Sequence, residues 1–388
     1  MKTSIKLAVL AVASIVALGA KADETIKFGV SAPLSGPGAP WGKGAEFLCK
    51  EAAKEIKGAG GIKVKGTSYN IECIAYDNKY TATDGTKVAQ TLLNRDGVKY
   101  MCAVGSAPIL AAQSLTERQG ALLFTQTWTK NGKGPDFPLT FSDIVTPFEV
   151  APAMIQYVTK AYPQAKTIAL LNVDDANGHG AADIVRPLWE KAGVKVLTSD
   201  FYAHGTTEFQ PAAQRLAALK PDMIDIASAP PAVIGQVLKE LSVLGYKGIK
   251  IATDGTAAEG IVATGGAAAE GLYMGAAITF DGPSVTEHQR KLNAAAKPLI
   301  GESLSIASNP CYDAVYMLKA GAEKAQSLDP KAIAAALPTT RYTSFYADNV
   351  GFGGKAVYGS DVQPKLPVYI TQIENGKVVE KAKIMPNY

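Results

Sequence analysis

The residues of this chain that have useful chemistry are hydroxyls placed directly after predicted strands. Ser106 follows a strand expected at 100–104, and Thr127 and Thr129 follow one expected at 122–124. A hydroxyl beside the free amides of a helix start attracts anions such as a carboxylate. Each residue also has an ordinary explanation, because serine is a preferred helix cap and threonine is common in polar turns. We therefore treat them as candidates for a carboxylate site.

An acid and two tryptophans extend this set of candidates. Asp254 follows a strand predicted at 249–252, within Thr-Asp-Gly. Its carboxylate can pair with an ammonium group in a closed cleft, although the local sequence favours an ordinary Asp-Gly turn. Trp41 and Trp128 lie in predicted loops. They can cover an apolar part of a ligand, or pack as a lid against another part of the protein.

Signals for catalysis, metals or cofactors are weak. Asp174, Asp175 and His179 share one predicted loop, and the Asn-Gly between them favours a solvated turn over a metal site or general base. The chain has three histidines in all, His179, His204 and His288. The sequence has no GxSxG, HExxH or Walker motif, and the glycines of 36–38 have the wrong spacing for a dinucleotide. We expect neither an enzyme nor a cofactor.

The four cysteines show no metal-ligand spacing; they are Cys49, Cys73, Cys102 and Cys311. In an oxidising compartment they can pair in three ways, and the sequence does not choose among them. Cys49 lies on a helix predicted at 45–56 and Cys73 on the next strand, so contact between these two is plausible. The other pairings stay open.

The elements that position the candidates alternate between strand and helix. Strands are expected at 26–30, 71–76, 100–104 and 122–124, and helices at 45–56, 83–94 and 111–118. This alternation predicts an α/β fold with a parallel sheet covered on both faces, where ligands bind beyond the carboxyl ends of the strands. The pattern restarts after Pro147, which indicates two α/β units. Near the end, Asn375-Gly376 predicts a hairpin.

The first 22 residues are typical of an export signal. Lys2 and Lys6 precede an apolar run at 7–20, and Ala20-Lys21-Ala22 predicts cleavage before Asp23. The run is short for a membrane span. Cleavage leaves 36 basic against 35 acidic residues, a net charge of +1 instead of +4. This charge argues against nucleic acid or an anionic membrane as the main partner.

Several motifs together resemble a known family. They are Ile26-Lys-Phe-Gly-Val with Leu34-Ser-Gly-Pro, Gly60-Gly-Ile, Tyr76-Asp77 and Gly235-Gln-Val-Leu. With them, nearly all of the chain after the leader resembles the branched-chain amino acid (Leu/Ile/Val) substrate-binding proteins of ABC transporters, which are type I periplasmic binding proteins. The resemblance implies two Rossmann-like lobes with parallel sheets, joined by a three-strand hinge. We expect an N-terminal lobe of residues 23–146 with 278–358 and a C-terminal lobe of residues 147–277 with 359–388.

The resemblance also assigns roles to residues. It implies that Ser106, the Ala107 amide and Thr129 bind a carboxylate, and that Asp254 binds ammonium. The segment Thr127-Trp128-Thr129 corresponds to an Ala-Ala-Thr segment of the family, and we expect Trp41 and Trp128 to contact the side chain of the ligand. Trp41 corresponds to the aromatic residue of the first loop. Departures from the family pattern are expected at Asn177, where the family has a tyrosine, near Pro230, where it has another, and near Ala307, so the pocket is altered.

These expectations combine into one predicted function. We expect a monomeric periplasmic binding protein that takes an amino acid, branched-chain-like or larger and apolar, and delivers it to an ABC transporter permease. The same fold binding an aromatic or other organic carboxylate that lacks an amine is one alternative. A receptor-linked sensory module and a secreted hydrolase are the others.

Overall fold

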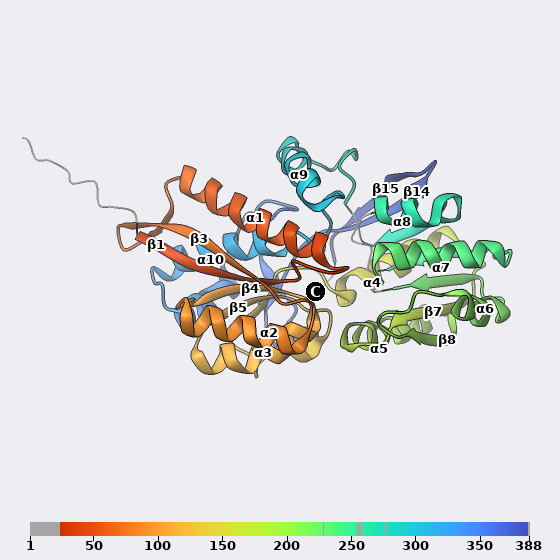
Figure 1. The fold of residues 1–388 in the computed structure, drawn as a ribbon, viewed down its shortest axis with the longest axis horizontal. Helices are drawn as coiled ribbons and strands as arrows, with labels where there is room; N and C mark the ends of the chain where they lie inside the picture. The colour runs from red at the N-terminus through yellow and green to blue at the C-terminus, as the bar shows by residue number, and fades with distance from the viewer. Residues whose placement is uncertain (1–23, 228, 254–257, 276–277, 387–388) are drawn as a thin grey trace, which may run out of the picture.

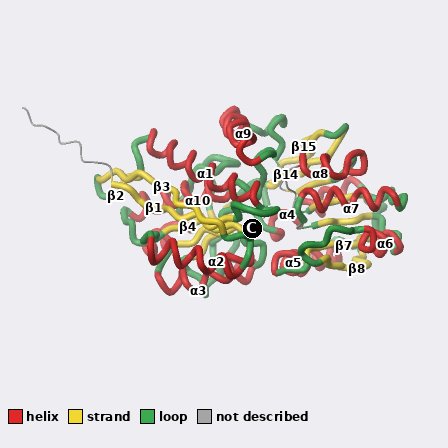
Figure 2. The backbone as a smooth tube through the Cα atoms, in the orientation of Figure 1, coloured by secondary structure: helices red, strands yellow, loops and turns green. Residues whose placement is uncertain are grey.

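The computed structural model describes residues 24–227, 229–253, 258–275 and 278–386, apart from the side chains of Asn131 and Ala176. The predicted leader at 1–22 and the candidate Asp254 lie outside these ranges. Figure 1 shows two lobes side by side, each with a central sheet and helices outside it, and Figure 2 shows the same layers by secondary structure. None of the helices within the described ranges is both long and apolar enough to span a membrane.

The first lobe is built on a six-stranded sheet in the order β2-β3-β1-β4-β5-β6. Its strands are β1 Glu24–Ala32, β2 Ile62–Val64, β3 Thr67–Asp77, β4 Tyr100–Val104, β5 Leu122–Gln126 and β6 Thr140–Ser142. All neighbouring pairs are parallel except β2 with β3. The inner strands β4 and β5 are short and fully buried, as expected for strands covered on both faces, whereas β3 is longer and only partly buried.

Helices cover both faces of this first sheet. The helices of this lobe are α1 Ala39–Gly58, α2 Ala82–Gln90, α3 Ser106–Gln119, α9 Glu287–Ile300, α10 Pro310–Ala325 and α11 Pro330–Ala336, with a π-turn at Thr91–Arg95 and 3₁₀ turns at Lys130–Gly132 and Leu337–Thr339. Cys102 and Val104 share one apolar cluster with α1 and α10, whereas Met101 and Ala103 join α2 and α3 on the opposite face. Alternating side chains of β4 therefore serve two cores.

The second lobe is built on a seven-stranded sheet in the order β15-β14-β11-β10-β9-β7-β8. Its strands are β7 Thr167–Val173, β8 Lys195–Tyr202, β9 Met223–Ile226, β10 Ile249–Ala252, β11 Tyr273–Gly275, β14 Val368–Glu374 and β15 Lys377–Ile384. Its helices are α4 Pro147–Ala161, α5 Ala176–Lys191, α6 Gln210–Ala218, α7 Pro231–Val243 and α8 Ala258–Gly265, with a 3₁₀ turn at Gly266–Ala269. The predicted hairpin is confirmed: Asn375 and Gly376 both have positive φ between β14 and β15.

The chain moves between the two sheets more than once. It leaves the first sheet after β6, returns after β11 to form α9, α10 and α11 against the first lobe, and enters the second sheet again at β14. Short elements precede that last passage, namely β12 Phe352–Gly353, α12 Lys355–Tyr358 and β13 Gln363–Pro364. The hydroxyl of Tyr358 lies 2.8 Å from that of Thr146 and donates to Glu149 at 3.1 Å, which joins two of the connecting segments.

Three helices begin earlier than the sequence predicts. The segments at 31–44, 105–110 and 173–180 were expected to be loops, but α1 begins at Ala39, α3 at Ser106 and α5 at Ala176. The prediction that Trp41 lies in a loop is therefore wrong. The first two segments contain both glycine and proline, which are typical of loops. Pro40 and Pro108 nevertheless lie in the first turns of α1 and α3, where the missing N–H of a proline costs no hydrogen bond within the helix.

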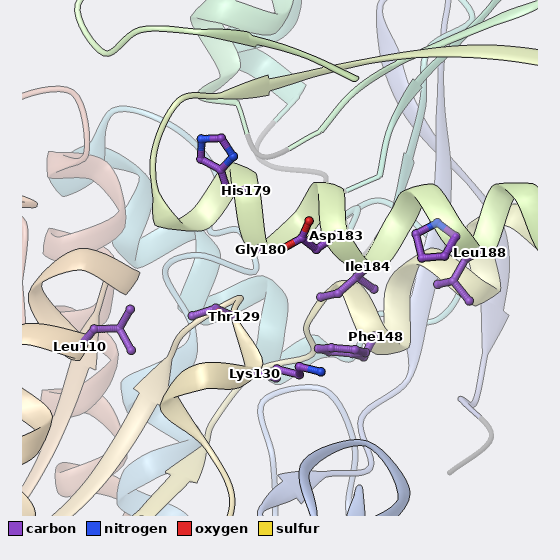
Figure 3. Close-up of a pocket in the computed structure, with 10 residues that line it drawn as sticks. Leu110, Thr129, Lys130, Phe148, His179, Gly180, Asp183, Ile184 and Leu188 are labelled. Atoms are coloured by element: carbon purple, nitrogen blue, oxygen red, sulfur yellow. The ribbon is translucent and has the colours of Figure 1, made fainter. Parts of the chain in front are cut away.

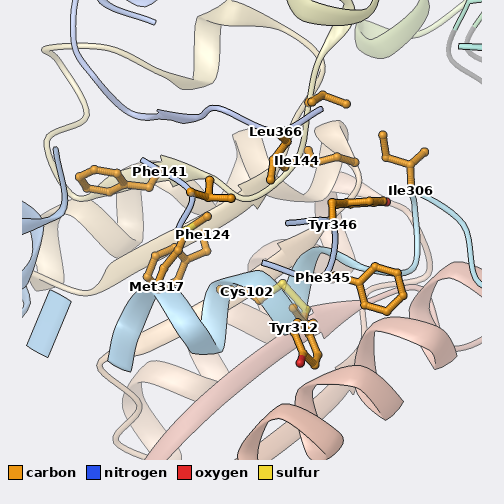
Figure 4. Packing of buried hydrophobic residues seen from close by; sticks show 14 of the residues in the cluster. Cys102, Phe124, Phe141, Ile144, Ile306, Tyr312, Met317, Phe345, Tyr346 and Leu366 are labelled. Carbon is orange, nitrogen blue, oxygen red and sulfur yellow. A yellow bond between two sulfur atoms is a disulfide. The ribbon is translucent and has the colours of Figure 1, made fainter. Parts of the chain in front are cut away.

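Two disulfides reinforce the first lobe. The expected contact of Cys49 with Cys73 is confirmed as a disulfide between α1 and β3. Cys102 of β4 pairs with Cys311 of α10 across a sequence separation of 209 residues. Figure 4 shows this second bond within the apolar cluster that includes Phe124. Both bonds therefore attach a helix to the first sheet.

Candidate functional site

Ser106 lies at the centre of a hydrogen-bonded cluster between the lobes. It is 1% exposed, and its Oγ accepts from the hydroxyl of Thr127 at 3.2 Å and from the amide of Trp128 at 3.3 Å. The Ser106 hydroxyl donates to Oδ1 of Asn177, in the second lobe, at 3.1 Å. The capping explanation is wrong, because Gly105 is the N-cap of α3 and that cap makes no side-chain hydrogen bond.

The three residues after β5 are buried rather than part of a solvated turn. Thr127, Trp128 and Thr129 are 0, 8 and 6% exposed. Thr129 packs against Gly180 of α5: a Cβ added at Gly180 would lie 3.2 Å from the Thr129 Cβ. This close approach brings the two lobes together beside Ser106.

Asn177 is positioned by the start of α5. Asp175 caps this helix, with one carboxylate oxygen accepting from the amides of Asn177 and Gly178 at 2.8 Å each. A Cβ at Gly178 would lie 1.9 Å from the Val173 carbonyl oxygen, so only glycine fits there. The other Asp175 oxygen lies 2.8 Å from Nε2 of His204. The expected solvated loop is instead a capped helix start facing the first lobe.

Two motifs that carried the resemblance meet at the first loop. Asp77, at the end of β3, accepts from the Leu34 amide at 2.8 Å and from the Ser35 hydroxyl at 2.5 Å. Burial acts against ionisation, but these bonds together hold the pKa of Asp77 below its usual value. They fix the chain just before α1, the helix that carries Trp41.

The sequence reasoning missed two tyrosines and assigned no role to His204. The ring of Tyr80 lies 6.1 Å from that of Trp41 and 6.5 Å from that of His204 in the second lobe. Among the described residues, the buried hydroxyl of Tyr202 has no hydrogen-bond partner. Burial, reinforced by the negative charge of Asp175, raises the pKa of both tyrosines, so both phenols are neutral. The available signal was position, since Tyr80 follows β3 and Tyr202 ends β8.

The remaining predicted residues are Ala107, whose backbone amide is the expected donor, and Asp254, which lies outside the described residues. Ala107 stands in the first turn of α3, where backbone amides lack partners within the helix. For Asp254 only its surroundings are described: the preceding Thr253 donates its amide and hydroxyl to the buried Asp225 at 3.0 and 2.5 Å. Burial raises the pKa of Asp225 to about 6 despite these bonds.

A pocket of about 510 Å³ opens between the lobes next to the cluster (Figure 3). Its walls are Leu110, Thr129, Lys130, Phe148, His179, Gly180, Asp183, Ile184, Pro187 and Leu188. Ser106 and Asn177 are not among its lining residues, so it adjoins the hydroxyl cluster through Thr129 and Gly180. His179 bonds to Asp174 at 2.7 Å and stacks on Phe201, which gives it a structural role.

Several characterised binding proteins are similar to this chain in sequence or in fold. The leucine-, isoleucine-, valine-, threonine- and alanine-binding protein of Pseudomonas aeruginosa is 26% identical over 352 residues, which cover 90% of this chain and 91% of that protein. A leucine-binding protein from Thermotoga maritima superposes with a TM-score of 0.79 at 19% identity, covering 93% and 99% of the two chains. A solute-binding protein of an ABC transporter from R. palustris, in complex with benzoate, has a TM-score of 0.76 at 17% identity, covering 93% and 97%.

The family assignment rests on the length of the match. The family model of the periplasmic binding proteins matches residues 25–377, which include the first sheet from Thr25 onward and all strands of the second sheet except β15. The predicted two-lobed α/β fold and the resemblance to the Leu/Ile/Val-binding proteins are confirmed. This chain belongs to the periplasmic binding protein family.

Proposed function

We propose that this protein binds a small carboxylate-bearing solute between its lobes and delivers it to the permease of an ABC transporter. The observation that carries the proposal is the buried Ser106 hydroxyl, which the first lobe surrounds with donors and which Asn177 of the second lobe contacts at 3.1 Å. A solute that binds the closed arrangement better than the open one stabilises closure by that difference.

The chemistry around Ser106 suits a carboxylate. The Thr127 hydroxyl, the Trp128 amide and the first-turn amides of α3, including that of Ala107, are donors within one small region. The positive end of the α3 dipole adds to their attraction for an anion. Because Ser106 and Thr127 are buried, hydrogen bonds there form away from water and are stronger than on the surface.

We favour an apolar amino acid as the solute, with Asp254 holding its ammonium group. Both oxygens of Asp175 are occupied, one by the α5 amides and one by His204, so this nearer acid is already committed. The relative from Pseudomonas aeruginosa is named for binding five amino acids.

A second candidate is an aromatic carboxylate that lacks an amine. The edge-to-face pair of Trp41 and Tyr80, with Tyr202 near Tyr80, provides aromatic surface that suits an aryl ring. The R. palustris neighbour holds benzoate, which shows that this fold accommodates such a solute.

A thermal-shift panel of amino acids and benzoates, followed by calorimetry on the best compound, tests the proposal. For an amino acid, Asp254→Asn should weaken binding at least tenfold; for a benzoate it should have little effect. Mass spectrometry should recover the solute chemically unchanged, as expected of a binding protein rather than a hydrolase. Absence of binding across the panel would contradict the proposed function.

The leader and the two lobes bear on where the protein acts and in what form. We propose that residues 1–22 are removed on export, that the protein acts as a monomer in the periplasm, and that the two lobes comprise residues 23–146 with 278–358 and 147–277 with 359–388. Light scattering of the secreted protein tests the monomer, and N-terminal sequencing tests cleavage before Asp23.

A further inference from the structure

We propose that Glu259, Lys297 and Ser303 form a latch between the lobes that sets solute affinity by stabilising closure, without contact to the solute. We call these three residues the α8–α9 latch. The inference rests on the proposed function, because it treats closure of the lobes as part of binding. Its members are positioning residues, and they stand apart from the Ser106 cluster.

The latch joins elements of different lobes. Glu259 stands in the first turn of α8, which packs against α7 on the second sheet. Lys297 lies in the last turn of α9, which packs against α1 on the first lobe, and Ser303 follows that helix. The Lys297 ammonium lies 3.2 Å from Oε1 of Glu259, and the Ser303 hydroxyl donates to the same oxygen.

This geometry differs from that of other ion pairs on the surface. Lys50 with Glu46 on α1 and Arg186 with Glu190 on α5 each lie within one helix, so moving the lobes leaves them intact. Opening the lobes separates Glu259 from both of its partners. Only a contact that is present in one state and absent in the other shifts the balance between the states.

The charges at the latch favour an ionised Glu259. Burial acts against ionisation, but hydrogen bonds from Ser303 and Lys297 together hold the pKa of Glu259 below its usual value. The Glu259 and Lys297 side chains are 45% and 53% exposed, so water and salt screen the pair. We therefore expect an effect of two- to fivefold on affinity, and a smaller one at high salt.

A second acid opposes the latch. The Glu302 carboxylate lies 3.7 Å from the position that a Cβ would take on Gly260, beside Glu259. Burial, followed by the charge of Glu259, raises the pKa of Glu302 to about 7. Closure therefore brings a like charge toward Glu259, and removing that charge should strengthen the closed state. Glu302→Gln is thus a variant of opposite expected sign at the same place.

The test is a double-mutant cycle on the full secreted protein. Glu259→Gln, Lys297→Met and the double variant are compared by calorimetry, with L-leucine or benzoate as the probe according to the thermal-shift panel, and by stopped-flow dissociation. Each single variant should raise Kd two- to fivefold through faster dissociation, and the double variant should be no worse than one single variant. Glu302→Gln should lower Kd at pH 8, and Glu46→Gln on α1 should leave it unchanged.

A second readout does not depend on any solute. Small-angle scattering of the ligand-free protein should give a larger radius of gyration for the double variant than for the parent. Unchanged Kd in both single variants, additive losses in the double variant, or identical scattering would overturn the latch. A lack of binding to every probe would instead overturn the proposed function, and scattering would still decide the latch.

Discussion

The two lobes share an architecture but differ in how they are held together. The first lobe contains both disulfides, which attach α1 and α10 to its sheet. The second lobe has no cysteine, so its helices are held by apolar packing and by polar contacts such as the ion pair of Arg215 on α6 with Asp200 on β8. The candidate site divides in the same way, with Ser106 on the cross-linked lobe and Asn177 on the other. We infer that the first lobe is a preformed platform for the solute and that the second closes over it.

Removing the long-range disulfide should have the largest effect on the difference in stability between the lobes. Cys102→Ala with Cys311→Ala should lower the free energy of unfolding of the first lobe by about 5 kcal/mol, because the bond closes a loop of 209 residues. Trp189 is buried in the second lobe, whereas Trp41 and Trp128 belong to the first. Urea titrations that follow Trp189 alone, with Trp41 and Trp128 replaced by Phe, report the second lobe.

The matched variant is Cys49→Ala with Cys73→Ala. It opens a loop of 24 residues and should lower the free energy of unfolding by about 3.5 kcal/mol. If removal of either disulfide shifts the Trp189 transition by the full expected loss, the lobes unfold as one unit and the contrast in stability between them disappears.

Buried acids give the next largest expected difference. Burial raises the pKa of Asp313 in the first lobe to about 7, against about 6 for Asp225 in the second. Both values lie above the unfolded value of about 3.9, so the folded protein holds extra protons. Their stabilising contribution is complete below pH 4 and is lost as pH rises to 6 for Asp225 and to 7 for Asp313, on the order of 3–4 kcal/mol each.

Urea denaturation between pH 4 and 8 measures that loss. Asp313→Asn should flatten the slope of stability against pH up to pH 7, and Asp225→Asn should flatten it only up to about pH 6. A slope that neither substitution changes would assign the pH dependence to other groups.

Affinity should depend more on the platform than on the closing lobe. Ser106→Ala removes a hydroxyl at the centre of the cluster and leaves Thr127 and Trp128 without their acceptor, so we expect a loss of about 2–3 kcal/mol, or 30- to 150-fold in Kd. Calorimetry with the best compound of the panel measures it. Ser114→Ala, on the exposed side of the same helix, is the control. A loss below threefold would remove Ser106 from the site.

The smallest expected effect on solute affinity comes from a substitution in the second lobe. Asn177→Ala removes the amide that faces Ser106 and should cost about 1 kcal/mol, near fivefold in Kd, mainly through faster dissociation. Asn177→Asp keeps the shape but adds a negative charge, so it should weaken a carboxylate solute more than Asn177→Ala does. The reverse order would indicate that Asn177 faces a cationic group.

Position along the chain predicted part of the site. Ser106, Thr127 and Thr129 were selected as candidates because they follow strands β4 and β5, and parallel strands end at a common edge; the structure brings them close together, and their role in binding stays a prediction. The same rule applies to Tyr80 and Tyr202, but nothing in a single tyrosine distinguishes a ligand contact from a surface residue. Tyr80 also has a φ of 59°, a conformation fixed by its surroundings and not by its type.

Local sequence pattern was least informative for features that depend on tertiary structure, such as the pairing of distant cysteines. Short-range proximity predicted Cys49 with Cys73, whereas Cys102 meets Cys311 only because α10 returns to the first sheet after the second lobe is complete. Helix starts were misplaced because glycine and proline mark both loops and first turns, as at Pro40 and Pro108. The hydrogen bond of Ser106 to Asn177 spans 71 residues and has no local signal.

The order of the cysteines has a consequence for how the chain matures. Each partner is the next cysteine along the sequence, so on the export that we propose, thiols that oxidise in the order in which they emerge give the native connectivity. The first bond can close once Cys73 has been translocated, but the second must wait until the whole of β7–β11 has passed and Cys311 follows. Cys102 therefore remains unpaired for most of synthesis, and it is the thiol most exposed to wrong partners if export stalls.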